Sequence, residues 1–239
     1  MNLFSAVSHS AASDTVGLSK QFPCHVVSLS DIRYVQKYFC NLEEKICGEL
    51  ELRLFEDITD KEYQDLFYSD KRAFIHEEAA EGLLRASKSL REQGARLVVY
   101  ATYRSKRIEN WIDEKLKDCL IHPYQRNVLY SCGRAVTVSL MKDTGDPIDM
   151  HEGEFDLLQM IQQQCQRAES PSADILKNRE ELKKAMEEVG FEQSPYFWWE
   201  FSFKKQSDCL EQRDFPSLDF YMVEIEEILQ TKKKLKACS

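Results

Sequence analysis

The clearest group of residues that could do chemistry is the run Tyr103-Arg104-Ser105-Lys106-Arg107. It follows a short apolar segment typical of a buried strand and precedes a helical pattern, so Arg104 is predicted to lie at a strand end and to face a cleft. A fixed guanidinium there could bind a carboxylate through two hydrogen bonds or stabilise a developing oxyanion. The alternative is structural, with Arg104 paired to a neighbouring Asp or Glu. The spacing alone favours neither.

The other chemistry-bearing side chains are scattered. Cys132, before Gly133, could act as a nucleophile if a His lay near it, and is otherwise a buried thiol. His122 and His151 could each ligate a metal, but no spacing pairs them. The sequence contains no nucleophile elbow, no Gly-rich phosphate loop and no His-Glu-x-x-His motif. Its eight cysteines are irregularly spaced without a Cys-x-x-Cys pair, which indicates reduced thiols.

The elements that must position these residues alternate along the chain. Hydrophobic periodicity predicts helices at 74–93, 108–116, 155–166 and 178–189. Alternating or short apolar runs predict strands at 26–29, 51–56, 96–100, 127–141 and 197–203. Gly133 is expected at a tight turn or bulge. Because the sequence has no internal repeat and no low-complexity linker, it predicts one α+β domain.

Composition narrows the class of protein further. The chain of 239 residues is long enough to bury a sizeable core without disulfides or metal, and 43% hydrophobic with 31% charged residues is a globular profile. The net charge of −9 argues against nucleic acid as a partner. No apolar run is long enough to span a membrane, and residues 1–18 lack the charge and apolar core of a signal peptide. We expect a cytoplasmic protein; export by a signal-independent route would leave no trace in these patterns.

Several segments resemble, in order, the D-alanyl-D-alanine dipeptidases, the zinc enzymes of vancomycin resistance and cell-wall recycling. The matching segments are residues 77–86, 94–107, 133–140 and 178–203, with support from residues 31–34, Met150 and residues 155–156. The order and spacing hold from about residue 26 to 203, roughly three quarters of the chain. The resemblance implies an α+β fold with an antiparallel central sheet and helices packed on it, of the Hedgehog/DD-peptidase type.

The resemblance also implies a metal site that this sequence does not retain. In the family, a His and an Asp seven residues apart around a glycine, with a His after a Trp-Trp pair, hold Zn²⁺ and leave a position for the attacking water. This chain has Tyr130, Thr137 and Glu200 at those three positions. Hydroxyl groups are poor zinc ligands at neutral pH, and one carboxylate cannot hold the ion alone. The sequence therefore predicts no zinc and no other cofactor.

The catalytic positions have changed in the same way. The family's general base is a Glu before the Trp-Trp pair, and Phe197 stands there with no proton chemistry. Arg104 alone of the catalytic set is retained, although Ala101 and Ser105 depart from the family's Asp and Pro around it. The resemblance implies that Tyr103, Arg104 and Ser131 bind substrate.

These substitutions predict a pseudoenzyme, a dipeptidase-like protein that has lost zinc binding and peptidase activity and acts by binding. Its ligand would be a peptide carboxylate held by Arg104, or a protein partner; the oligomeric state stays open. One alternative is a remodelled hydrolase in which Glu200 and Tyr130 act with Cys132, His122 or His151 on a different metal or nucleophile. Residual dipeptidase activity is another alternative.

The predicted organisation has three parts. Residues 1–23 are Ser/Ala-rich and form a flexible N-terminal segment, and residues 24–216 form the dipeptidase-like α+β domain. Residues 217–239 form a C-terminal extension, partly helical, whose lysine-rich end suits a helix C-terminus. The two extensions are the candidate docking segments for a partner.

Overall fold

The fold is that of a computed structural model, which describes residues 28–46, 48–54, 61, 72–116, 129–151, 156, 171–204, 218–220 and 222–237. Its helices are α1 (Leu29–Tyr38), the 3₁₀ turn η2 (Leu42–Glu44), α3 (Glu77–Arg91), α4 (Lys106–Leu116), α6 (Ala173–Glu187) and α7 (Met222–Ala237). Its strands are β1 (Phe39–Asn41), β2 (Glu51–Leu52), β3 (Phe74–His76), β4 (Ala95–Ala101), β5 (Ala135–Lys142), β6 (Phe191–Gln193) and β7 (Glu200–Phe203).

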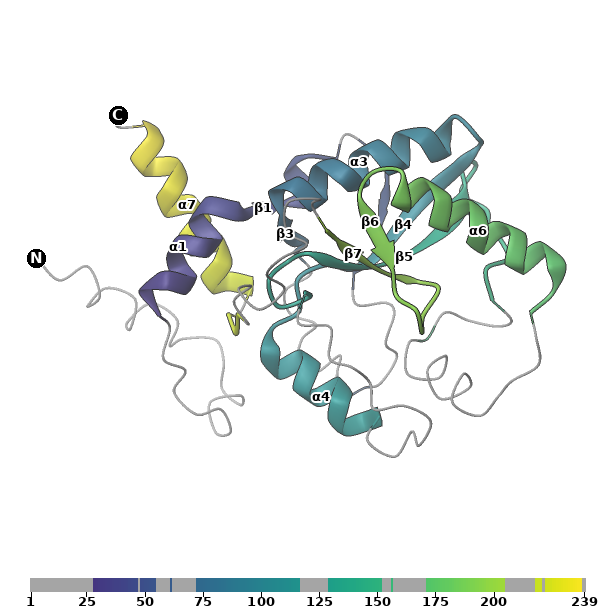
Figure 1. Cartoon of the computed structure of the whole chain (residues 1–239). Helices are drawn as coiled ribbons and strands as arrows, with labels where there is room; N and C mark the ends of the chain where they lie inside the picture. Colours follow the sequence, from purple (N-terminus) through teal and green to yellow (C-terminus); the bar gives the residue numbers. More distant parts are fainter. Residues whose placement is uncertain are drawn as a thin grey trace, which may run out of the picture.

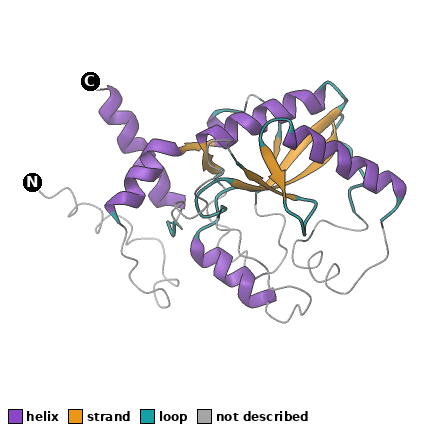
Figure 2. Cartoon of the chain, viewed as in Figure 1, coloured by secondary structure: helices purple, strands orange, loops and turns teal. Residues whose placement is uncertain are grey.

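The centre of the molecule is a five-stranded sheet in the order β2-β4-β5-β7-β6. Four of these strands pair antiparallel, and β4 and β5 form the longest ladder, with Leu97 opposite Leu140. The edge strand β2 pairs parallel with β4. A separate two-stranded sheet joins β1 to β3. The predicted class, α+β with an antiparallel central sheet and helices packed on it, is confirmed; the parallel edge pair is an addition to it (Figure 2).

The helices lie on both sides of this sheet (Figure 1). α3 and α6 contact each other on one face, while α4 lies on the opposite side in this view. α3 can approach the sheet closely because Gly82 has no side chain: a Cβ there would come 2.9 Å from Phe191 and 3.1 Å from Phe203. The first seven residues of β5 are buried, as expected for a strand covered on both faces.

The C-terminal part of the chain returns to the same core. α7 packs against α1 at one end of the molecule, where the two helices lie side by side (Figure 1). Leu218, Phe220, Ile225 and Leu229 are buried in one hydrophobic cluster that also contains residues of α3, β4 and β5. Two ion pairs bridge α7 to earlier parts of the chain, Lys233 to Glu44 and Arg72 to Glu226.

Several predicted element boundaries are wrong. Phe74–His76 form strand β3, so the helix predicted from Phe74 begins only at Glu77, where His76 accepts the Glu78 N–H through Nδ1 as an N-cap. Leu29, predicted in a strand, is the first residue of α1, and Ser28 caps that helix. The aromatic strand predicted from Phe197 begins at Glu200.

Other predictions fall on parts of the chain that the structure does not describe. The N-terminal segment 1–23 lies outside the described residues, and so does all but Asp156 of the helix predicted at 155–166. The strand predicted at 51–56 is described only to residue 54, and β2 ends at Leu52. The division at residue 216 stays a prediction.

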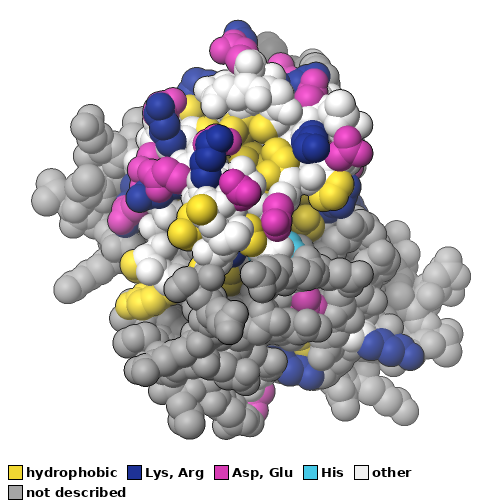
Figure 3. Space-filling view, turned by 90° about the vertical axis from the view of Figure 1, so that its right-hand side faces the viewer, with side chains coloured by type: hydrophobic (Ala, Val, Ile, Leu, Met, Phe, Trp, Pro, Cys, Tyr) yellow, Lys and Arg dark blue, Asp and Glu magenta, His cyan; other side chains and the backbone are white. Residues whose placement is uncertain are grey.

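The described surface carries charges of both signs. On the face shown in Figure 3, Lys and Arg side chains lie among Asp and Glu side chains, with apolar side chains between them. Surface ion pairs such as Arg96 with Asp143 and Lys204 with Glu192 fit this interspersed pattern. Among the helices in the described ranges, none combines the length and the apolar character that crossing a membrane requires.

Candidate functional site

Several of the residues that the sequence singled out lie close together beside the turn that precedes β5. Two of them carry hydroxyl groups, Tyr130 and Thr137. Leu129 O accepts hydrogen bonds from the N–H groups of Arg134 (2.7 Å) and Ala135 (3.0 Å), and Gly133 N–H donates to Tyr130 O (3.0 Å). Gly133 has φ = +74°, a conformation that glycine adopts without strain. The turn places Tyr130 beside β5, and its hydroxyl lies 2.7 Å from the Oγ1 atom of Thr137 in that strand.

Arg104 completes this group from the short segment between β4 and α4. Its guanidinium lies over the Tyr130 ring, 4.5 Å from the ring centre, and Nη2 donates to Thr137 Oγ1 at 3.4 Å. Its Nη1 lies 3.8 Å from Glu109 Oε1, and the two side chains are only 1% and 2% exposed. The structural alternative for Arg104, an ion pair with a nearby acid, is therefore the arrangement in this molecule. That acid comes from the first turn of α4.

Glu200 lies on the other side of Thr137. The two residues are partners in the register of β5 and β7, and both are buried. Burial raises the pKa of the Tyr130 hydroxyl well above its ordinary value, and the Glu200 carboxylate raises it further, while Arg104 opposes the shift. Tyr130 is therefore a neutral phenol at physiological pH. The buried group has a phenol, a hydroxyl, two carboxylates and one guanidinium. We call Arg104, Glu109, Tyr130, Thr137 and Glu200 the arginine cluster.

The remaining predicted substrate-binding residues, Tyr103 and Ser131, contact another part of the chain. The Tyr103 hydroxyl donates to Phe220 O (3.1 Å) and accepts from Phe220 N–H (2.9 Å). Ser131 O accepts from Leu218 N–H at 3.3 Å. Both residues are buried. Each is thus adjacent in sequence to a member of the arginine cluster, but their hydrogen bonds hold residues 218–220.

Comparison with known proteins gives the family of this chain. A sequence model described as D-Ala-D-Ala dipeptidase matches residues 44–218, which are 175 of the 239 residues. The chain belongs to the D-Ala-D-Ala dipeptidase family. No curated protein matches it. Among solved structures, that of the LdcB LD-carboxypeptidase, which concerns peptidoglycan recognition, matches with 16% sequence identity and a TM-score of 0.35, over 66% of this chain and 69% of its own.

The donor atoms at the positions that the sequence resemblance assigns to the metal do not fit zinc. Tyr130 and Thr137 are hydrogen-bonded directly to each other, and Tyr130 keeps its proton. The Arg104 guanidinium already provides a positive charge beside them. A structural or catalytic zinc needs at least three His, Cys or carboxylate ligands, and Glu200 is the one carboxylate that this set provides. Within the described ranges, no three His, Cys, Asp or Glu side chains are grouped closely enough to hold a metal ion.

Phe197, which the sequence resemblance places at the position of the general base, belongs to an aromatic stack. Its ring lies 5.1 Å from that of Trp199 at an interplanar angle of 27°, and Trp199 in turn contacts Trp198 edge to face. Trp198 is covered by the Arg179 guanidinium, 4.7 Å from its ring centre. The stack provides packing energy and holds no group that can accept a proton.

Of the thiol and imidazole groups of the alternative hydrolase, the structure describes Cys132 and His151, and each contacts other groups. The Cys132 thiol donates to Leu129 O at 3.3 Å, and burial raises its pKa to about 12, the opposite of what a nucleophilic cysteine needs. His151 stacks against Trp198 with ring centres 6.3 Å apart. His122 lies outside the described residues.

Sequence reasoning did not find Glu109, the ion-pair partner of Arg104. The signal was present in its position: an acid in the first turn of the helix that follows the arginine's strand, five residues along the chain. Acidic residues are common in the first turn of a helix because they interact favourably with the helix dipole. The position of Glu109 alone therefore does not identify it as the partner of Arg104. Only the burial of both side chains distinguishes Glu109 from an ordinary first-turn acid.

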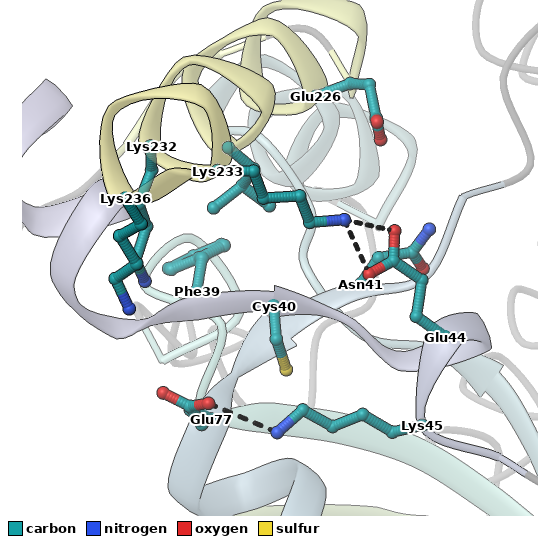
Figure 4. Close-up of a pocket in the computed structure, with 11 residues that line it drawn as sticks. Phe39, Cys40, Asn41, Glu44, Lys45, Glu77, Glu226, Lys232, Lys233 and Lys236 are labelled. Atoms are coloured by element: carbon teal, nitrogen blue, oxygen red, sulfur yellow. Dashed lines mark hydrogen bonds and ion pairs between the residues drawn. The ribbon is translucent and has the colours of Figure 1, made fainter. Parts of the chain in front are cut away.

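A pocket of about 280 Å³ lies elsewhere, between α7 and β1 (Figure 4). Phe39, Cys40 and Leu229 give it an apolar part, and burial raises the pKa of the Cys40 thiol to about 12. The pocket is also lined by four lysines and three glutamates, which are Lys45, Lys232, Lys233, Lys236, Glu44, Glu77 and Glu226. Among them, Lys45 forms an ion pair with Glu77, and Lys233 forms one with Glu44. Positive and negative side chains are therefore mixed around the pocket.

Proposed function

We propose that this chain is a non-catalytic member of the D-Ala-D-Ala dipeptidase family, which has lost zinc binding and peptidase activity and works as a binding protein. The observation that carries the proposal is the direct hydrogen bond of 2.7 Å between Tyr130 and Thr137, at two positions where the family has metal ligands. With the Arg104 guanidinium over the Tyr130 ring, an internal cation and a hydroxyl pair take the place of a metal site.

Peptide hydrolysis in this family depends on a Lewis acid that activates water and a base that accepts its proton. The aromatic stack of Phe197 provides no such base. Arg104 alone cannot replace either group, because a guanidinium stays protonated and here faces the Glu109 carboxylate. The buried Glu109 carboxylate already compensates the charge of Arg104, so a peptide carboxylate would have to compete with it for the guanidinium. We therefore place the binding function outside the arginine cluster.

Metal analysis together with a cleavage assay tests this proposal. The purified full-length chain, supplied with zinc and then dialysed, is expected to contain no stoichiometric zinc and to leave D-Ala-D-Ala intact. The positive control restores the family's residues by the substitutions Tyr130→His, Thr137→Asp, Phe197→Glu and Glu200→His. A gain of zinc in that variant shows that the assay detects a site in this fold. One zinc per wild-type chain with dipeptide cleavage would overturn the proposal.

A further inference from the structure

The first turn of α4 obtains its hydrogen bonds from a distant part of the chain. The first N–H groups of a helix have no acceptor within the helix and need one from outside. Lys106 N–H donates to Leu218 O (3.0 Å), and Arg107 N–H donates to Asp219 Oδ1 (3.1 Å). The Asp219 carboxylate thus occupies the place of an N-cap and lies at the positive end of the helix dipole.

The Asp219 side chain is also held by a two-point ion pair. Arg107 Nε lies 3.0 Å from Oδ1 and Nη2 lies 3.2 Å from Oδ2, while Nη2 also donates to Asp219 O at 3.1 Å. The two side chains are 16% and 23% exposed, so the pair is shielded from much of the solvent. Charge-assisted bidentate contacts of this kind select a carboxylate over a neutral amide.

Most backbone N–H and C=O groups of residues 218–220 form hydrogen bonds with other parts of the chain. Leu218 N–H and O, Asp219 O, and Phe220 N–H and O are all hydrogen-bonded, which makes five of the six backbone groups of the tripeptide. The side chains alternate, with Leu218 and Phe220 at 0% and 2% exposure and Asp219 turned to Arg107. Main-chain hydrogen bonds combined with contacts to alternate side chains are how proteins bind extended peptides.

We propose that Tyr103, Lys106, Arg107 and Ser131 form a recognition groove for an extended peptide of the pattern apolar–Asp–apolar. Residues 218–220 are its resident ligand, and a separate peptide of the same pattern binds when they are displaced. The groove is distinct from the arginine cluster and does not depend on the state of the zinc positions, so it goes beyond the function proposed above.

The test displaces the resident segment in the full-length chain and supplies the ligand separately. The substitution Asp219→Lys places a positive charge against Arg107 and is expected to release residues 218–220 from the groove, at a cost in stability because Leu218 and Phe220 leave the main hydrophobic cluster. Acetyl-Leu-Asp-Phe-amide, which carries the same backbone groups, is then titrated while the amide signals of Lys106 and Arg107 are followed by NMR. We expect saturable shifts of these signals, and an affinity at least about tenfold higher than for the wild type, where the groove is occupied.

Two matched controls decide what is recognised. Acetyl-Leu-Asn-Phe-amide has the same shape without the charge and is expected to bind at least about tenfold more weakly. The double variant Arg107→Glu with Asp219→Lys reverses the ion pair, so the Asp peptide is expected not to bind it. If the Asp219→Lys chain loses its dispersed NMR spectrum, Asp219→Asn is titrated instead, and the Asp peptide is expected to bind it more tightly than it binds the wild type because the resident segment then lacks the charge. Absence of peptide binding in a folded Asp219→Lys chain, no gain of affinity in Asp219→Asn over the wild type, or equal affinity for the two peptides would overturn the proposal.

Discussion

At the scale of single residues, a side chain's neighbours decide its role. Arg104 is the residue type and position that an oxyanion-stabilising group requires, and the sequence left that role and a structural one equally open. In the structure its guanidinium pairs with the Glu109 carboxylate, donates a hydrogen bond to the Thr137 hydroxyl and lies over the Tyr130 ring. Because a catalytic arginine must be available to substrate and this side chain is 1% exposed, we expect Arg104 to support the fold.

This difference gives a prediction about Arg104 itself. Arg104→Met keeps much of the volume but leaves the buried Glu109 carboxylate without the guanidinium, and is expected to lower the free energy of unfolding by about 3–5 kcal/mol. The double variant with Glu109→Leu removes both charges and is expected to recover much of that loss. Urea unfolding of the wild type, both single variants and the double variant measures the coupling. A cost below about 0.5 kcal/mol for Arg104→Met, typical of surface changes, would contradict a structural role.

At the scale of elements, periodicity predicted most of the long strands and helices but missed the ten-residue helix α1 and three short strands. β4, β5, α4 and α6 were found because seven or more residues carry a recognisable pattern. β1, β3 and β6 have three residues each, too few for a period, and β3 exists because it pairs with β1 more than thirty residues away. Phe74 and Ile75 also fit the apolar face of the helix that follows, so the sequence assigned them to it.

The candidate site shows the same limit. The sequence resemblance pointed to Tyr130, Thr137, Glu200 and Phe197, and the structure brings the first three together with Arg104. What the sequence could not provide was the set of contacts between elements. The Tyr130–Thr137 hydrogen bond depends on how the turn folds back over β5, and the hydrogen bonds to residues 218–220 join segments more than eighty residues apart.

The turn before β5 makes a prediction at this scale, with a matched control in the same chain. Gly133 and Gly48 have nearly the same positive φ, +74° and +76°, so alanine strains the backbone equally at both, by about 1–2 kcal/mol. A Cβ at Gly133 would also lie 2.7 Å from the Phe39 ring and 2.9 Å from the His76 backbone nitrogen. At Gly48 a Cβ meets no described atom within 4 Å.

Gly133→Ala should therefore destabilise the chain by about 1–3 kcal/mol more than Gly48→Ala, since overpacking adds to the same backbone strain. The measurement is the free energy of unfolding in urea for the two variants beside the wild type. Equal losses would mean that β1 and β3 move away from the turn without cost, which would contradict the close approach of the two-stranded sheet to Gly133.

At the scale of the whole molecule, the question is whether the C-terminal residues form an appendage or part of one cooperative unit. The sequence predicted an extension from residue 217, because the family resemblance ends before it. Yet Leu218 and Phe220 join the main hydrophobic cluster, and residues 218–220 satisfy the first turn of α4. α7 adds Ile225 and Leu229 to the same cluster. Elements that share a core and hydrogen bonds are expected to unfold together.

Ile225→Ala tests this cooperativity. Ile225 is fully buried, so its truncation should lower the free energy of unfolding by about 2–5 kcal/mol. Leu235, 66% exposed on the same helix, is the control, and Leu235→Ala should cost less than about 0.5 kcal/mol.

All three tryptophans, Trp111, Trp198 and Trp199, lie outside α7, so their fluorescence in urea reports on the rest of the molecule. If α7 is part of one unit, Ile225→Ala shifts that transition to lower urea. An unchanged tryptophan transition, with faster hydrogen exchange confined to α7, would instead make the C-terminal helix an independently unfolding appendage, because its loss would then leave the sheet and the arginine cluster intact.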